Sequence, residues 1–529
     1  MSPMRLRGSS LAPLLLALTS FATGCAAPTG GDEAESAGQD ITSAQAITDV
    51  CASSAFLGRP GAALSGDAGS VLYVARCPSS GPGKILRVDP KANTTVEIGT
   101  FAAGPGTTIY FQDYGADFAL WRVMKEKASP TGPRIERQIG LWDAALAAPV
   151  SVDPNPLFPR NYEDPRAEWV DFLAYAGQGR VVASWEWSYQ SRQLGVVSLA
   201  SGQPVWTAPA RIYSKRSSVR ASSDRKTFLV STDRGPYALD VGANVTVRAL
   251  DQALSAETLP YDVTGNYPEI DPGRVLYQLA SASGRWAWSS VNVKTGVRTD
   301  LGTALEYSGV MSPGRTAAFA NDGTPAALVL GPNGVGVELR VVRPDGSVVA
   351  SAVPDGAKRV RYVAPKGAFV VVEEIVRVPG AQAGEKVDHA KLWLVRPGAN
   401  QPAAALLGGV EVAPYTSGTP VPQEHAGGVN LFAWKYDRTW SLVGIDAQGA
   451  ATRELVLPGT YLHTLQGQRI LSDDCVVDLA GAAPAPVANG CIEGATPPRR
   501  APWVPLSGAR VFVLHDGASS RQTAKIFRY

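Results

Sequence analysis

The chain is poor in charge. Only 18% of its 529 residues are Asp, Glu, Lys or Arg, and 49 basic residues against 47 acidic ones leave a formal net charge of +2 at pH 7. Such a balance gives no electrostatic case for binding nucleic acid or an anionic membrane surface. The basic residues are scattered rather than arranged in a stripe with aromatics, so we expect no nucleic-acid partner.

Histidine and local catalytic motifs are equally scarce. The four histidines contain no pair three or four residues apart, and G-x-S-x-G, P-loop, dinucleotide and calcium-loop motifs are absent. The sequence therefore predicts no metal, no cofactor and no catalytic residue of these classes. An enzyme site assembled from distant loops remains an alternative.

Long apolar runs are lacking apart from one at the N-terminus. Leu11 to Phe21 follows Arg5 and Arg7, and is too short to span a bilayer. It ends in Ala-Thr-Gly-Cys at residues 22–25, which resembles the lipobox of bacterial lipoproteins, although the family prefers Leu where Ala22 stands. An ordinary secretory signal with a free cysteine is the alternative.

The resemblance implies a signal peptide over residues 1–24 and a diacylated Cys25 as the mature N-terminus. Ala26, rather than Asp, after the cysteine implies sorting to the outer membrane. Residues 25–48 contain acidic but no basic or aromatic side chains and are expected to form a flexible tether. Contact with the membrane is then through the N-terminal lipid only.

The five cysteines fit this interpretation, because lipidation of Cys25 leaves an even number. Two disulfides are expected in an oxidising compartment. Three connectivities are possible, and we favour the short-range pairs Cys51–Cys77 and Cys475–Cys491.

The rest of the sequence, residues 49–529, repeats one β unit. A short apolar strand led by Gly or Lys, such as GSVLYVARC or GVNLFAWKY, recurs ten times at a mean spacing of about 49 residues. The ten copies start at residues 69, 115, 179, 225, 273, 314, 366, 428, 467 and 508.

Most copies are followed by two alternating strands around a tight polar turn, as in LRVVRPDGSVVASA, and are preceded by a shorter extended piece. Four strands at this period predict an all-β fold, a β-propeller of four-stranded antiparallel blades. We expect eight or more blades, with seven to ten possible.

One phrase carries a family resemblance. Residues 312–319, SPGRTAAF, resemble the S-P-D-G-x-x-φ-A-F phrase of TolB-like, WD-repeat-related propellers, with degenerate copies at 364–369 and 222–228. The resemblance implies the fold but no function, because that fold serves several.

The last unit ends at Tyr529 without a fourth strand. The extended segment from Ala46 to Val50 is expected to supply that strand and so close the ring across the termini, which removes exposed sheet edges. Cys51 would then help to lock the closure.

Three long segments, 153–169, 257–272 and 413–427, combine carboxylates with Tyr or Trp, a combination suited to sugar or cationic peptide. Carboxylates from two of them could also form an acid/base pair, and solvated turns stiffened by Pro are the third interpretation. The third segment carries Glu424 and His425. The candidate ligand-binding residues are Arg160, Tyr162, Asp164, Arg166, Trp169, Tyr261, Asp262, Tyr267 and Glu269.

Aromatic residues alternate along three strands and so share one face of each. They could form a stacking platform, but packing between blades is favoured because the sets recur at equivalent repeat positions. The sets are Trp185, Trp187 and Tyr189; Trp286 and Trp288; and Phe432, Trp434 and Tyr436.

Together these observations predict a monomeric, outer-membrane-anchored lipoprotein whose propeller binds an envelope protein, peptide or glycan without catalysis. Two alternatives remain: a propeller enzyme acting on polysaccharide as a hydrolase or lyase, and an accessory protein of envelope assembly.

Overall fold

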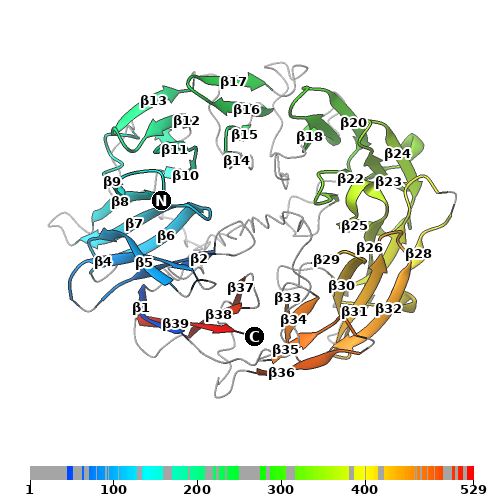
Figure 1. Ribbon diagram of the computed structural model, residues 1–529. Helices are drawn as coiled ribbons and strands as arrows, with labels where there is room; N and C mark the ends of the chain where they lie inside the picture. The colour runs from blue at the N-terminus through cyan, green and yellow to red at the C-terminus, as the bar shows by residue number, and fades with distance from the viewer. Residues whose placement is uncertain are drawn as a thin grey trace, which may run out of the picture.

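The structure is a computed structural model of the full chain, and its strands are arranged as a ring (Figure 1). It describes residues 45–51, 62–64, 71–78, 80–89, 92, 94–104, 107–127, 134–158, 170–188, 191–208, 218–221, 225–232, 235–249, 274–280, 286–305, 316–379, 386–399, 401–414, 422–457, 459, 462–464, 468–472, 475–481, 483–491, 503–506, 510–515 and 521–528.

The described strands form nine antiparallel sheets, and the largest sheet joins two blades. The ring therefore has ten blades in the described part of the chain, numbered here in chain order. The all-β propeller expected from the repeats is confirmed, and ten lies at the upper limit of the expected blade number.

Blades 1 to 3 contain β2 (Ala62–Leu64), β3 (Leu72–Arg76), β4 (Gly83–Asp89) and β5 (Thr94–Phe101); β6 (Thr107–Tyr114), β7 (Phe118–Lys127), β8 (Arg134–Asp143) and β9 (Val150–Val152); and β10 (Val170–Tyr175), β11 (Arg180–Ser188), β12 (Ser191–Ser198) and β13 (Gln203–Thr207).

Blades 4 to 6 contain β14 (Ser218–Ala221), β15 (Thr227–Thr232), β16 (Gly235–Val241) and β17 (Val245–Ala249); β18 (Arg274–Ala280), β19 (Trp286–Asn292) and β20 (Arg298–Thr303); and β21 (Ala317–Phe319), β22 (Pro325–Leu330), β23 (Val337–Val342) and β24 (Val348–Ala352).

Blades 7 and 8 contain β25 (Ala357–Val363), β26 (Val370–Pro379), β27 (Lys386–Val395) and β28 (Ala404–Ala405); and β29 (Gln423–His425), β30 (Gly428–Trp434), β31 (Trp440–Asp446) and β32 (Ala451–Leu457). Three short 3₁₀ turns lie in blades 6 and 7, namely η2 (Pro332–Gly334), η3 (Pro365–Gly367) and η4 (Leu407–Gly409).

Blades 9 and 10 contain β33 (Leu462–Thr464), β34 (Arg469–Ser472), β35 (Cys475–Asp478) and β36 (Ala485–Cys491); and β37 (Trp503–Leu506), β38 (Arg510–His515), β39 (Arg521–Arg528) and β1 (Gln45–Cys51).

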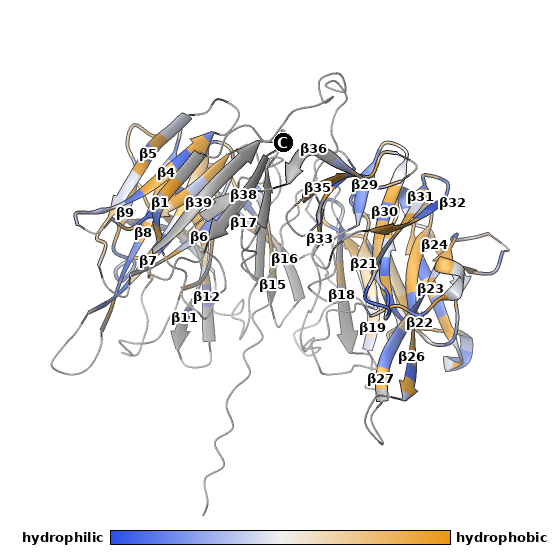
Figure 2. Ribbon diagram, turned by 90° about the horizontal axis from the view of Figure 1, so that it is seen from below, coloured by the Kyte–Doolittle hydropathy of each residue, from blue (hydrophilic) through white to orange (hydrophobic). Residues whose placement is uncertain are grey.

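The repeated phrase occupies the same place in most blades. Eight of its ten copies form the second strand of their blade. In β3 and β30 this central strand is buried almost throughout and therefore reads as an almost continuous apolar run. Figure 2 shows this apolar character in β30. The outer strands alternate between exposed and half-buried residues, as in β24.

Two copies depart from this register. The phrase at residue 314 forms the first strand, β21, rather than the second, and the phrase at 273 forms β18, the first described strand of a three-stranded sheet. The repeat spacing alone does not show such shifts, because neighbouring strands of a blade share the same alternation.

The N-terminal segment closes the ring, as the incomplete last unit predicts. β1 pairs antiparallel with β39, from Gln45 opposite Ile526 to Cys51 opposite Arg521. Val50 also pairs with Arg76 of β3, so blades 10 and 1 form one continuous sheet. A shift of register lies between Ile47 and Val50, where Asp49 adopts a positive φ of 62°.

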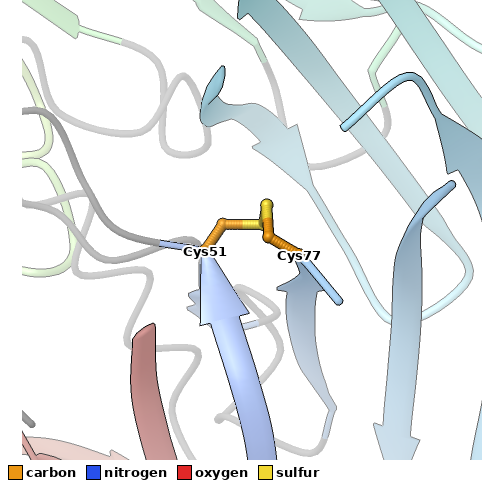
Figure 3. The surroundings of a disulfide bond; sticks show 2 residues. All are labelled: Cys51 and Cys77. Atoms are coloured by element: carbon orange, nitrogen blue, oxygen red, sulfur yellow. A yellow bond between two sulfur atoms is a disulfide. The ribbon is translucent and has the colours of Figure 1, made fainter. Parts of the chain in front are cut away.

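A disulfide reinforces this closure. Cys51 at the end of β1 is bonded to Cys77, which follows β3, with 5.0 Å between their Cα atoms (Figure 3). The backbone N–H of Cys77 donates to the carbonyl of Asp49 at 2.7 Å. This predicted pair is confirmed. Cys475 is also disulfide-bonded, and Cys491 lies directly opposite it in the register of β35 and β36.

The hydrophobic core lies between the blades rather than at one centre. One cluster joins Phe432 and Trp440 of blade 8 to Ile470 and Val477 of blade 9, and others bridge blades in the same way. The favoured packing interpretation is confirmed for Trp185, Trp288 and Phe432, which are buried in such clusters. Among the described members of the three sets Tyr436 is the exposed one, at 44%, while the side chains of Trp187 and Tyr189 lie outside the described residues.

Arginine side chains add polar ties between blades. Arg180 of blade 3 donates to the carbonyl of Gly242 in blade 4 at 2.7 Å, and Arg396 of blade 7 donates to that of Gly449 in blade 8 at 2.7 Å. Charge-assisted donors of this kind satisfy turn carbonyls while holding neighbouring sheets together. Further ties are Arg87 to Ala116, Arg122 to Val170, Arg248 to Val293, Arg340 to Leu301, Arg343 to Pro397, Arg361 to Phe432 and Arg453 to Gly481.

Candidate binding surface at one end of the ring

The antiparallel blades give the ring two distinct ends. Turns between first and second strands and between third and fourth strands share one end, which we call the turn end. Turns between second and third strands, and the connections between blades, share the other, which we call the loop end. The β26–β27 hairpin points to the loop end (lower edge in Figure 2).

All nine candidate ligand-binding residues lie outside the described residues, as does Cys25. β9 and β17, which come just before the first two candidate segments, both end at the loop end. The third segment is not a single loop, because Gln423–His425 form β29, the inner strand of blade 8. Glu424 and His425 are therefore strand residues that lead into the turn end.

A node of polar contacts joins three blades at the turn end. Asp113 of blade 2 accepts from the backbone N–H of Tyr175 in blade 3 at 2.7 Å. Arg225 of blade 4 donates to both carboxylate oxygens of Asp113, at 2.5 and 3.0 Å, and its guanidinium lies 4.3 Å from the centre of the Phe118 ring. The Tyr175 hydroxyl donates to Asp143; burial, then this bond, raises the pKa of Tyr175.

A second node follows the same plan in blades 6 to 8. The backbone N–H of Lys366 donates to Asp322 at 2.5 Å, and the Tyr362 hydroxyl donates to Glu424 at 2.7 Å. Burial first, and then the Glu424 charge, raises the pKa of Tyr362. Burial followed by the charge of Arg453 lowers the pKa of His425. Carboxylates of both nodes are thus engaged in joining blades, a structural role.

The loop end carries a different cluster, formed by Tyr436, His389 and Glu411, which we call the Tyr436 platform. The His389 imidazole stacks on the Tyr436 ring with centroids 3.7 Å apart and planes 19° apart. Nδ1 of His389 lies 2.7 Å from a Glu411 carboxylate oxygen, which fixes the proton on that nitrogen. The Tyr436 hydroxyl donates to the carbonyl of Asp388 at 3.0 Å.

Three separate segments supply this platform. His389 lies in β27 of blade 7, Tyr436 in the hairpin turn between β30 and β31 of blade 8, and Glu411 in the connection between the two blades. Burial, then the charges of Glu411 and Asp388, raises the pKa of Tyr436, so the phenol stays neutral. The result is an exposed aromatic ring bordered by an imidazole and a carboxylate.

Sequence reasoning missed this cluster as a site. It noted the alternation of Phe432, Trp434 and Tyr436, of which only the last is exposed. No local sequence pattern marks His389 as a site residue, because its partners Glu411 and Tyr436 are 22 and 47 residues away along the chain.

Within the described part of the chain, no group of three or more His, Cys, Asp or Glu side chains is arranged to hold a metal ion. None of the described helices is long and apolar enough to cross a membrane.

Comparison with known proteins gives only distant similarity. No protein-family model matches the chain. No curated protein sequence matches it either. Among solved structures, TolB from Acinetobacter baumannii is 13% identical over 54% of this chain and 63% of its own, with a TM-score of 0.25.

An oligogalacturonate lyase in complex with manganese is 11% identical over 53% of this chain and 75% of its own, with a TM-score of 0.29. Dipeptidyl peptidase 4 from Porphyromonas gingivalis is 12% identical over 63% of this chain and 50% of its own, with a TM-score of 0.36. Similarity at this level assigns no function.

The strand order and ring arrangement on their own define the class of this protein, a closed β-propeller. Its first strand completes its last blade, and its one described exposed aromatic platform lies at the loop end.

Proposed function

We propose that the protein is an outer-membrane lipoprotein whose propeller binds an envelope protein, peptide or glycan at its loop end without catalysis. Cys25 carries the lipid. Because β1 begins at Gln45, the tether is residues 25–44 of the expected 25–48. Twenty residues of flexible coil have an average reach of about 25 Å, enough to hold the ring clear of the membrane surface.

The observation that carries this proposal is the direction of β1. The strand begins at Gln45, which pairs with Ile526 near the end of β39, and third strands such as β39 end at the turn end. The tether therefore joins the ring at the turn end. A ring attached there has its turn end nearest to the lipid, and the loop end, with the Tyr436 platform, is the end farther from the attachment point.

The paired carboxylates at the two ends of the ring support binding rather than catalysis. At the turn end, Asp113 is held by Arg225, and Glu424 by Tyr362. At the loop end, Glu411 is held by His389. Such carboxylates hold segments of the ring together. Acid/base catalysis instead needs two carboxyl groups at a defined separation on either side of the bond that is cleaved.

Site-specific photo-crosslinking in cells tests this proposal. A photoreactive amino acid replaces Asp437 in the β30–β31 turn at the loop end or, as the matched control, Asp345 in the β23–β24 turn at the turn end. Both residues are exposed hairpin-turn positions. We expect a discrete adduct from position 437 and none from 345, and loss of membrane fractionation with Cys25→Ala.

Adducts from position 345 alone would contradict the proposed orientation. A purified chain that cleaves an envelope polysaccharide would contradict the non-catalytic assignment and favour the hydrolase or lyase alternative.

A further inference from the structure

We propose that the Tyr436 platform is a stacking site for a neutral pyranose ring, so that the ligand of the loop end is a glycan. This inference rests on the proposed binding function and specifies its ligand.

The exposed ring is available on one side only. His389 covers one face of Tyr436, and the hydroxyl is tied to Asp388, yet 44% of the residue is exposed. The exposed surface is therefore largely the second face of the ring and its edge. An aromatic face of this kind offers apolar area to the C–H face of a sugar while its position stays fixed.

Polar groups able to bind sugar hydroxyls lie close to Tyr436: His389 stacks on its ring, Glu411 contacts His389, and the Asp388 carbonyl accepts from its hydroxyl. With the Nδ1 proton directed at Glu411, Nε2 of a neutral His389 imidazole is a hydrogen-bond acceptor. Glu411 keeps acceptor capacity beyond this one bond, since an ionised carboxylate has about four lone-pair sites. Asp388, whose carbonyl accepts from the Tyr436 hydroxyl, also forms an exposed ion pair with Arg377 at 3.2 Å.

The charge around the platform argues for a neutral ligand. Acidic and basic side chains alternate and are largely paired, as in Arg377 with Asp388 and Lys435 with Glu454 at 2.9 Å. A polyanion or polycation site would need a cluster of one sign, because steering depends on the summed field. A neutral pyranose fits a surface whose acidic and basic side chains are paired in this way.

The platform is rigid before any ligand arrives. Val412 bridges both Ala390 of β27 and Lys435, and so fixes the adjacent Glu411 between two blades. The turn that carries Tyr436 is closed by a hydrogen bond from the N–H of Arg438 to the carbonyl of Lys435 at 3.0 Å, with Arg438 at φ 68°. A preorganised site avoids the entropic cost of ordering on binding.

The test uses the full chain in detergent micelles and five labelled hexasaccharides, built from glucose, N-acetylglucosamine, galactose, mannose and xylose. Binding is measured by fluorescence polarisation. We expect at least one to bind. Tyr436→Ala should weaken binding by about tenfold or more, and His389→Ala by about threefold or more, because it frees the ring and removes the Nε2 acceptor.

Two control variants sharpen the result. Tyr436→Phe keeps the ring and loses only the bond to Asp388, so it should bind within about threefold of the unmodified chain. Val335→Ala changes an exposed residue elsewhere, in the η2 turn of blade 6, and should leave binding unchanged. Equal melting temperatures would show that each variant is folded.

The outcomes of these measurements distinguish failure of the glycan proposal from failure of the proposed binding function. Hexasaccharide binding that Tyr436→Ala leaves intact would overturn the platform while the proposed binding function stands. No binding to any of the five would overturn the glycan assignment. If the photo-crosslinked partner is a protein and its capture depends on Tyr436, the platform is a protein contact and the glycan proposal is wrong. Absence of any adduct from the loop end would instead contradict the proposed function itself.

Discussion

Cys51 is joined to Cys77 by a disulfide that ties the strand completing the last blade to the first blade of the ring. β1 also pairs with β3 through Val50 and Arg76. The closure thus has three components, namely the β1–β39 ladder, the β1–β3 contact and the covalent bond. Without β1, β39 would be left as an open edge.

Replacing both cysteines of this bond by serine should destabilise the protein by about 3 kcal/mol, as expected for a loop of 26 residues in the chain-entropy account. Unfolding by guanidinium under oxidising conditions measures the difference. The variant retains the second predicted disulfide, so reductant should still lower its stability. Equal unfolding midpoints for variant and parent would show that the ladder alone holds the ring closed.

Arg225→Ala should destabilise the chain by about 2 kcal/mol, because it leaves Asp113 partly buried with two backbone N–H donors, of Tyr114 and Tyr175, but no charged partner. Arg225→Lys should recover little of this loss, since a lysine neither bonds both carboxylate oxygens at once nor stacks on Phe118 as a planar group. A double-mutant cycle with Asp113→Asn measures the coupling. A coupling near zero would mean that the node contributes no stability.

Gly428→Ala should cost more than about 3 kcal/mol or prevent folding. Its φ is +145°, and a Cβ would lie 2.0 Å from the carbonyl oxygen of Ile445. Gly81→Ala is the matched control, because φ there is +89° but nothing lies within 4 Å of the added carbon, so only about 1 kcal/mol of backbone strain is expected. Similar unfolding free energies for the two variants would contradict the steric explanation.

Stability should fall as the pH drops below 6.5 toward the lowered folded-state pKa of His425. Because the folded chain holds this imidazole neutral while the unfolded chain protonates it, the unfolded state takes up the extra proton in that window. Urea unfolding of the parent and of His425→Gln at several pH values between 5 and 8 isolates this contribution. Parallel pH profiles would show that His425 plays no part in the pH dependence.

Much of the fold could be predicted from period-two alternation and from turn signals such as Pro-Asp-Gly at 344–346. These features are local, and they mark the hairpins of each blade. Ring closure was predictable as well, because the last unit lacked a strand and the first extended segment had no unit of its own. The blade number was less certain, since the phrases at 273 and 314 sit in different strands from the other eight.

The site was much harder to predict. The contact between His389 and Tyr436 depends on how blade 7 packs against blade 8, and no local pattern encodes that geometry. The arginine ties have the same origin: Arg180 and Arg396 look like scattered surface charges until the neighbouring turn carbonyls are in place. The loop residues from Arg160 to Trp169 and from Tyr261 to Glu269 stay predictions.

β1 completes the last blade, and its start fixes where the proposed tether joins the ring. Paired-cysteine trapping tests this arrangement most directly, with Ala46→Cys and Lys525→Cys, which are opposite each other in the register of β1 and β39. Opposed strand positions have Cα separations within disulfide range. The control pairs Ala46→Cys with Gln522→Cys, which is three residues out of register.

We expect mild oxidation of the folded chain to link the peptides containing residues 46 and 525, as detected by mass spectrometry after proteolysis. The control pair should stay unlinked. Separate peptides from the first variant, or equal linkage in both, would contradict closure of the ring by β1.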